Sequence, residues 1–120
     1  MSRISLKILY RNLGGKYFSD YRKLDQKFRE AIGADRGDVV IGEKQLRLGL
    51  RVNILAYCAG KAVGFVRLDL RSQPPLIGDV FVEPEFRGEE VILDKTPWLD
   101  NEEGYRIWQY LIKAAYIIAR

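Results

Sequence analysis

Residues 76–91, LIGDVFVEPEFRGEEV, decide how the rest of the chain is interpreted. The first half of this stretch is apolar and rich in β-branched residues, which predicts a buried strand over residues 77–82. Pro84 ends the strand, because proline lacks the N–H that a sheet requires and disfavours a helical conformation at the residue before it. Arg87 and Gly88 follow at once. A strand that ends in such a turn can present backbone N–H groups to an anion, although a strand with an ordinary polar loop after it would look the same.

Two short motifs in this part of the chain resemble those of a known family. The runs VGFVR at 63–67 and DVFVEPEFRG at 79–88 are similar to the middle of the GNAT superfamily of acyl-CoA-dependent N-acyltransferases. In that family a hairpin carrying V-G-F leads to a strand of the form V-x-P-x-[YF]-R-G, and then to a helix. The resemblance covers residues 52–91. It implies an N-acetyltransferase-like protein that uses acetyl-CoA to acylate an amine on a small molecule or a protein.

The resemblance also implies where the cofactor would lie. The pantetheine runs along the strand and bonds to its backbone, and the diphosphate sits on N–H groups of the turn that enters the helix. The implied cofactor-binding residues are Phe81, Val82, Arg87, Gly88, Glu89, Glu90 and Val91. Glu90 and Ile92 stand where the family has small residues. Like charges within several ångströms cost on the order of 1 kcal/mol near a surface, so the carboxylates of Glu89 and Glu90 would have to face away from a phosphate.

Acyl transfer to an amine requires a base and hydrogen-bond donors to the thioester oxygen. The chain has no histidine, which excludes Ser-His-Asp triads and leaves carboxylates as the available bases. Asp79 and Glu83 are the candidate catalytic residues, with the N–H of Val82 as the donor to the carbonyl. Glu83 could equally be a solvated strand end. With Cys58 as the single cysteine, no usual zinc site is expected, and that residue is interpreted as a small buried hydrophobe.

Hydrophobic spacing predicts the elements that come before this stretch. Apolar residues at intervals of four, three, four and three indicate a helix over 16–32, which Gly33 ends and whose polar side carries Asp25 and Arg29. The aromatic stripe of this helix, Tyr17, Phe18, Tyr21 and Phe28, is interpreted as core. Strands are predicted at 4–10, 39–41 and 46–52, followed by a hairpin of 54–59 and 62–70 that turns at Gly60.

The C-terminal part is predicted to hold a second helix, over 105–119, with Asp100 as its N-cap. Its apolar residues cover most of its circumference, and such a helix should be buried on most sides. The last strands of the family and its frequent tyrosine acid are also missing after this helix. Together these features predict a homodimer.

The elements add up to an α+β (mixed α/β) fold, with a mostly antiparallel sheet of about five strands, an N-terminal helix and a C-terminal helix. The 120 residues are interpreted as one domain, 1–120. No run of about 18 apolar residues is present, so no membrane association is expected, and without a signal-peptide pattern at the N-terminus a cytoplasmic location is expected.

Charge is unevenly distributed. Residues 1–72 hold 15 Lys and Arg against 7 Asp and Glu, whereas residues 73–120 hold 5 against 9. Arg36, Lys44, Arg47 and Arg51 could therefore bind a nucleic acid, although no nucleic-acid motif accompanies them, and the arginines could simply lie on the wet side of a sheet. A GNAT-shaped module without catalysis, serving binding or regulation, is the other alternative.

Overall fold

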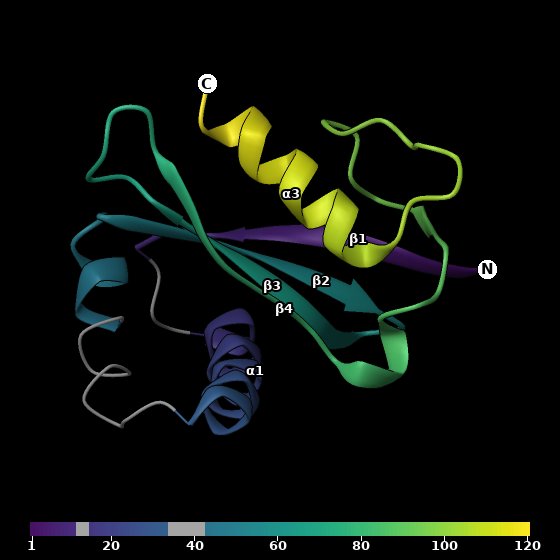
Figure 1. Cartoon of the computed structure of the whole chain (residues 1–120), viewed down its shortest axis with the longest axis horizontal. Coiled ribbons are helices and arrows are strands. Elements are labelled where there is room, and N and C mark those ends of the chain that lie inside the picture. Colours follow the sequence, from purple (N-terminus) through teal and green to yellow (C-terminus); the bar gives the residue numbers. More distant parts are fainter. Residues whose placement is uncertain (12–14, 34–42) are drawn as a thin grey trace.

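The computed structural model describes residues 1–11, 15–33 and 43–120. A five-stranded sheet is covered by one helix on each face, so the chain forms three layers (Figure 1). The elements in chain order are β1 (Ser2–Leu9), α1 (Gly15–Ile32), β2 (Arg51–Cys58), β3 (Lys61–Asp69), β4 (Leu76–Val82), the 3-10 turn η1 (Pro84–Phe86), β5 (Val91–Leu93) and α3 (Ile107–Ile118). The strand order is β4-β3-β2-β1-β5, and β5 runs parallel to β1 while the other pairs are antiparallel. The predicted fold class is confirmed.

The hairpin β2–β3 forms the middle of the sheet. It is joined by Ala59 and Gly60, both of which have positive φ, 50° and 79°. Two such residues match the two-residue turn whose twist suits a hairpin. Both strands are buried along almost their whole length, since helices cover both faces. The predicted hairpin and its turn residue are therefore confirmed.

Helix α1 packs on one face of the sheet through aromatic side chains. Phe18, Tyr21 and Phe28 are buried, and the ring of Phe28 meets those of Phe65 and Phe81 nearly edge-on at 5.6 and 5.8 Å. The predicted helix is confirmed, and Gly33 ends it at φ +69°. The buried stripe starts one residue later than the spacing predicted, because Phe18 points inward and Tyr17 outward.

Asp25 and Arg29, predicted on the polar side of α1, are both buried. The reason lies on β3, where the buried side chain of Arg67 binds the Asp25 carboxylate. Arg29 Nε donates to the same carboxylate at 2.9 Å. Asp25 and Arg29 follow Tyr21 by four and eight residues, so they lie on the buried face of α1 and the prediction of a polar side is wrong. The charge of Arg67 opposite them is what allows charged residues in this interface.

Three further predictions differ from the structure. Residues 43–47 form a helical turn, whereas a strand was predicted to start at residue 46, so Arg47 and Arg51 do not share one strand face. The predicted strand at 39–41 and Arg36 lie outside the described residues. Strand β4, predicted as buried, is an edge strand that is largely exposed before Phe81. Helix α3 is capped at Arg106, not Asp100, and the side-chain oxygen of Gln109 accepts the N–H of Arg106 at 2.8 Å.

Helix α3 covers the other face of the sheet. Ile107, Tyr110 and Leu111 are fully buried there, whereas Trp108 and Tyr116 on the outer side are 46% and 63% exposed. The prediction that this helix is buried on most sides is therefore wrong for the single chain, because one sheet face covers one side of a helix. Cys58 is half-buried at the edge of this core. Among the described helices, none combines the length and the apolar character needed to cross a membrane.

Candidate functional site

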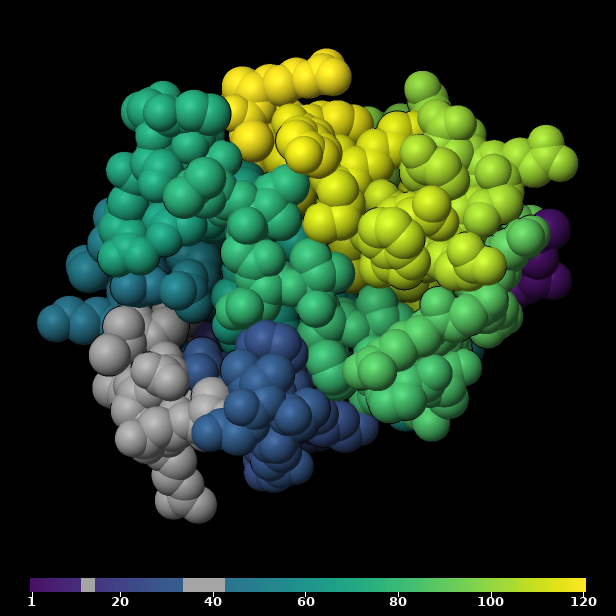
Figure 2. Space-filling view, viewed as in Figure 1, coloured from purple at the N-terminus to yellow at the C-terminus, as the bar shows by residue number. Residues whose placement is uncertain are grey.

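The outer edge of β4 is the first component of the candidate site. Figure 2 shows β4 and the residues after it (green) at the surface between α3 (yellow) and α1 (blue). Glu83 N–H donates inward to Val63 O at 2.8 Å. Because N–H direction alternates along a strand, the N–H and C=O of Val82 point outward. Arg87 Nε donates to that Val82 oxygen at 2.7 Å, which agrees with this direction. The Val82 N–H is left facing the open edge.

The start of α3 is the second component, and the chain reaches it only after a long excursion. Residues 89–105 leave the end of the β4 segment and return, so that Arg106 Nε donates to Gly88 O at 3.3 Å. Val91 N–H donates to Tyr105 O at 3.0 Å, which closes the base of the excursion. The helix expected directly after Arg87-Gly88 is therefore displaced in sequence but not in space.

The amides at this corner are divided between those already bonded and those left open. Phe86 and Arg87 donate to Glu83 O and Pro84 O, at 2.9 and 3.3 Å, within the η1 turn. At the start of α3, the N–H groups of residues 109 and 110 both donate to Arg106 O. Within the described part of the chain, the N–H groups of residues 107 and 108 donate no hydrogen bond, as is usual in a first helical turn. Ile107 is fully buried and Trp108 is 46% exposed, so Trp108 is the one of the two that a ligand can approach.

Glu89 and Glu90, the two acidic residues predicted at this corner, are held by contacts with β1 and with the start of α3. Glu89 accepts hydrogen bonds from the N–H of Ser2, at 3.2 Å, and from its hydroxyl. That side chain is therefore held against β1 rather than over the corner. The backbone of Glu90 forms an isolated antiparallel β-bridge with the backbone of Arg106. Around Gly88, no protein atom comes within 4 Å of the position that a Cβ would take, so its backbone is open to approach.

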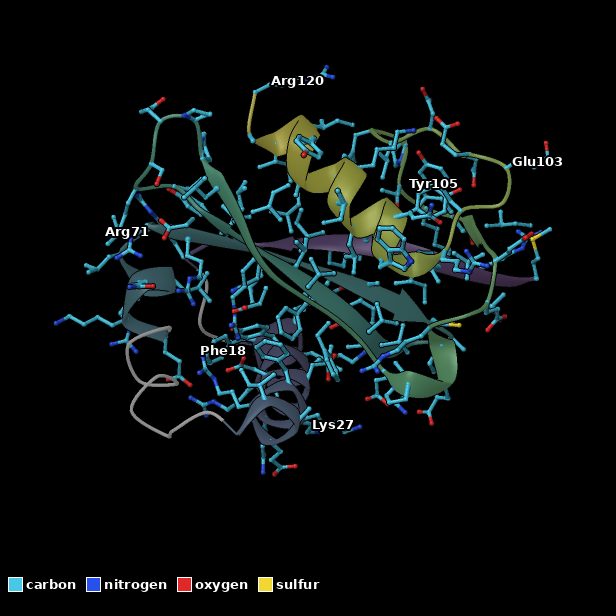
Figure 3. The ribbon with its side chains drawn as sticks, viewed as in Figure 1. Phe18, Lys27, Arg71, Glu103, Tyr105 and Arg120 are labelled. Atoms are coloured by element: carbon cyan, nitrogen blue, oxygen red, sulfur yellow. The ribbon has the colours of Figure 1, made fainter. Side chains whose placement is uncertain are left out.

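Glu83 forms the wall of a pocket of about 540 Å³ between α1 and the start of β3. Its side chain is only 6% exposed and binds Lys27 Nζ at 2.6 Å, with Lys61 Nζ at 3.8 Å. Lys27 reaches it from the side of α1 that faces η1 (Figure 3). Burial raises the pKa of Glu83, but hydrogen bonds with Lys27 and Glu85 outweigh it, so that the pKa lies below its usual value. Glu83 is thus an ionised carboxylate in a pocket and not a solvated strand end.

Asp79 lies on the same face of β4, four residues earlier. Its side chain is half exposed, and it accepts a hydrogen bond from Arg67 Nη1 at 2.6 Å. Asp79 and Glu83 are therefore each bound by a different cation, and the structure does not join them in one site. Among the described residues no group of acidic or cysteine side chains could hold a metal ion.

Sequence reasoning did not assign four contributors to this region: Lys27, Lys61, Arg106 and Trp108. Lys27 and Glu83 are 56 positions apart, and no local pattern distinguishes Lys27 from the other lysines of α1. Lys61 could have been suspected, because it directly follows the hairpin turn that borders the predicted strand. For α3, the sequence indicated a displaced helix start at 104–107, about a dozen residues late, but not that it returns to Gly88, because Arg106 is 18 positions farther along the chain.

This arrangement of strands and helices is a GNAT-like fold. A ribosomal-protein-alanine N-acetyltransferase from Brucella melitensis biovar Abortus 2308 superposes with a TM-score of 0.62 at 16% identity, over 97% of this chain and 71% of that one. An aminoglycoside acetyltransferase, meta-AAC0020, from an uncultured soil metagenomic sample superposes with a TM-score of 0.59 at 17% identity, over 97% and 69%. No family model and no curated protein matches the sequence.

Proposed function

We propose that this chain is an acyl-CoA-dependent N-acetyltransferase-like enzyme that acylates an amine, with acetyl-CoA as the donor. The observation that carries this proposal is the meeting, within a GNAT-like fold, of the outward Val82 N–H and the open start of α3. An extended amide chain can bond to a free strand edge, and a diphosphate suits a helix N-terminus. The strand edge and the helix start lie at one corner of the molecule, so one ligand that carries an amide chain and a diphosphate could reach both.

In this proposal the pantetheine lies along the outer edge of β4, where the backbone of Val82 faces outward and that of Phe81 faces β3. Gly88 and the first amides of α3 hold the diphosphate, because the N-terminal end of a helix carries partial positive charge. Arg87 positions this edge by donating a hydrogen bond to the Val82 oxygen. Glu89, Glu90 and Val91 hold the turn in place through their contacts with Ser2, Arg106 and Tyr105. When bound, acetyl-CoA supplies an acyl group activated as a thioester.

The remaining roles belong to the chain itself. Val82 N–H donates to the acyl oxygen, and one such donor is worth on the order of 10²-fold to 10³-fold in rate. Glu83 accepts the proton that the amine loses, with the pocket beside α1 as the entry for the amine. Glu83 is ionised at neutral pH, and accepting a proton would require it to leave Lys27, which lowers its pKa and weakens it as a base. Asp79 is the second candidate base, and acting as one would require it to leave Arg67.

Calorimetric titration with acetyl-CoA tests the binding part of the proposal. Trp108→Pro removes the accessible amide within the first helical turn, where proline is tolerated. The control Trp108→Ala also truncates this side chain but keeps the N–H. A charge-assisted hydrogen bond is worth about 1.5–3 kcal/mol, so the proline variant should bind roughly 10- to 100-fold more weakly than the alanine variant. Equal affinity in the two variants, or no binding of millimolar acetyl-CoA to the unaltered chain, would refute this part.

Glu83→Gln tests the catalytic part in an assay of acyl transfer to amines. The expected loss in kcat is on the order of 10²-fold, with the affinity for acetyl-CoA unchanged. Glu30→Gln is the control, because Glu30 lines the same pocket, is exposed and does not contact Glu83. If both variants retain full kcat, Glu83 is not the base.

A non-catalytic GNAT-shaped module is the second candidate function. It is favoured by the ion pairing of both candidate bases, since Asp79 is bound by Arg67 and Glu83 by Lys27. This alternative predicts that Arg87→Ala leaves function untouched. Acyl transfer that disappears in the Arg87→Ala variant would exclude it.

A homodimer and a cytoplasmic location also remain proposals. The exposed Trp108 and Tyr116 on the outer side of α3 support the homodimer, because large apolar side chains on one helix face favour burial by a partner. Light scattering at tens of micromolar tests the oligomeric state, and a monomer there would contradict the proposal.

A further inference from the structure

A second hollow, of about 410 Å³, lies on the α1 face of the sheet beyond the cover of α1. Strand β1 forms its floor, and the start of α1, the β2–β3 turn and residues 94–95 form its walls. It shares only Gly60 with the pocket that contains Glu83. An inference about this hollow therefore does not rest on acyl transfer.

The charge of this groove is strongly positive and largely unbalanced. Arg3, Lys7, Lys16 and Lys95 line it, with Asp94 as the acidic residue of the lining. Among the described residues, the only carboxylate within ion-pair distance of these four cations is Asp20, 3.9 Å from Lys16. In the neighbouring pocket, by contrast, the cations Lys27 and Lys61 bind Glu83.

The cations are spread over more than the length of one phosphate group. Arg3 and Lys7 are four residues apart on one face of β1, which separates them by roughly 13 Å. Lys95 lies at the Arg3 end, because the N–H of the preceding residue, Asp94, donates to Ile4 O at 2.7 Å. Lys16 lies toward the same end, because its Nζ approaches Gly60 O at 3.4 Å and Gly60 follows Cys58, the partner of Ile4, by two residues. A single phosphate cannot reach all four cations, whereas an extended polyanion can.

An exposed aromatic ring borders the same groove. Tyr17 is 46% exposed, and Lys7 Nζ lies 5.8 Å from the centre of its ring. Its ring meets the buried ring of Tyr57 edge-on at 5.6 Å, which fixes its position. A group of cations beside an accessible ring is the combination that binds single-stranded nucleic acid, with phosphates on the cations and a base on the ring. An acidic peptide would use the cations but not the ring.

We propose that this groove binds single-stranded nucleic acid, with the phosphates along Arg3, Lys7, Lys16 and Lys95 and one base stacked on Tyr17. The location differs from the basic residues singled out by the sequence, Lys44, Arg47 and Arg51, which do not line this groove. Neutralising three or four phosphates of a single strand should give a slope of about −2 to −3 in log affinity against log salt.

Fluorescence anisotropy with a labelled eight-nucleotide oligo(U) tests the proposal. The double variant Arg3→Gln/Lys7→Gln should bind at least tenfold more weakly at low salt, and its salt slope should be smaller in magnitude by about 1.4. The matched control Lys44→Gln/Arg47→Gln loses the same charge outside the groove and should stay within about threefold. Tyr17→Leu should weaken binding about tenfold, whereas Tyr17→Phe should keep it.

Several results would overturn the proposal. These are no binding of the oligonucleotide at low salt, an equal loss in the Lys44→Gln/Arg47→Gln control, and full binding by the Tyr17→Leu variant. A poly-glutamate peptide that binds as tightly as the oligonucleotide, with the same sensitivity to Arg3→Gln/Lys7→Gln, would assign the groove to an acidic protein segment instead. Circular dichroism establishes that each variant is folded, which is expected because the altered side chains are not buried.

Discussion

Replacing the buried Arg67 with methionine should remove about 3 kcal/mol from the free energy of unfolding. Arg67 and Asp25 have side chains only 5% and 6% exposed. Removing one partner of a buried ion pair costs roughly 3–5 kcal/mol, because the other charge stays buried without its counterion. Asp25 keeps Arg29 at 2.9 Å, so the lower end of that range applies. Methionine keeps an apolar side chain beneath the rings of Phe28 and Phe65, which limits the loss to charge and hydrogen bonds.

The exposed pair of Arg71 and Asp69 provides a matched control. Its atoms are 2.6 Å apart, but the two side chains are 50% and 26% exposed. Exposed pairs contribute below about 1 kcal/mol, so Arg71→Met should be nearly neutral. At about 4 °C per kcal/mol for a domain of this size, the Tm of the Arg67→Met variant should fall by roughly 12 °C.

Urea unfolding followed by circular dichroism at 222 nm measures the difference, provided that the slope m is unchanged. The double variant Arg67→Met/Asp25→Asn adds a direct check, because it removes the charge that the first substitution isolates. It should recover at least about 1 kcal/mol relative to the sum of the two single variants. If Arg67→Met costs no more than Arg71→Met, or if the double variant shows no recovery, burial does not govern this ion pair.

Two further predictions concern the sheet edge and acid stability. A Cβ on Gly64 would lie 2.9 Å from the backbone oxygen of Phe81, so Gly64→Ala should lower the free energy of unfolding by about 1–3 kcal/mol. Gly88→Ala, with open space around the new Cβ, should be nearly neutral. Thermal or urea unfolding measures both variants, and equal effects would contradict the prediction. Hydrogen bonds from Arg71 lower the pKa of Asp69 to about 2, so its contribution to stability is present above the unfolded value near 4 and is lost as the pH falls toward 2. The Tm difference between the unaltered chain and Asp69→Asn should therefore shrink between pH 5 and pH 2, and a constant difference over that range would count against the ion pair.

Local patterns predicted those parts of the fold that local interactions determine. The spacing of apolar residues predicted α1, the Ala59-Gly60 region predicted the β2–β3 turn, and Pro84 predicted the end of β4. Where the predictions were wrong, distant residues had decided the outcome. Alternation at residues 46–52 suggested a strand, but Leu46 is fully buried from a helical turn.

The candidate site divides in the same way. Residue types alone excluded histidine chemistry and left Glu83 and Asp79 as the possible bases. Only the tertiary structure showed that Lys27 and Arg67 bind these two carboxylates, because each pairing joins different elements. A sequence shows which charges exist, whereas their pKa values and accessibility depend on neighbours that folding supplies.

From the sequence by itself, this protein was determined to be an α+β chain with a strand that ends at Pro84 and an Arg-Gly turn. The tertiary structure decided that the helix start at that turn is supplied by residues 106–108, after an excursion whose ends meet at Gly88 and Arg106. It also decided that four cations from three parts of the chain line one groove. The physical reason is the distance over which each interaction acts. Backbone preferences act within a few residues of the sequence, whereas chain closure and electrostatic pairing depend on distances in space that only the folded chain defines.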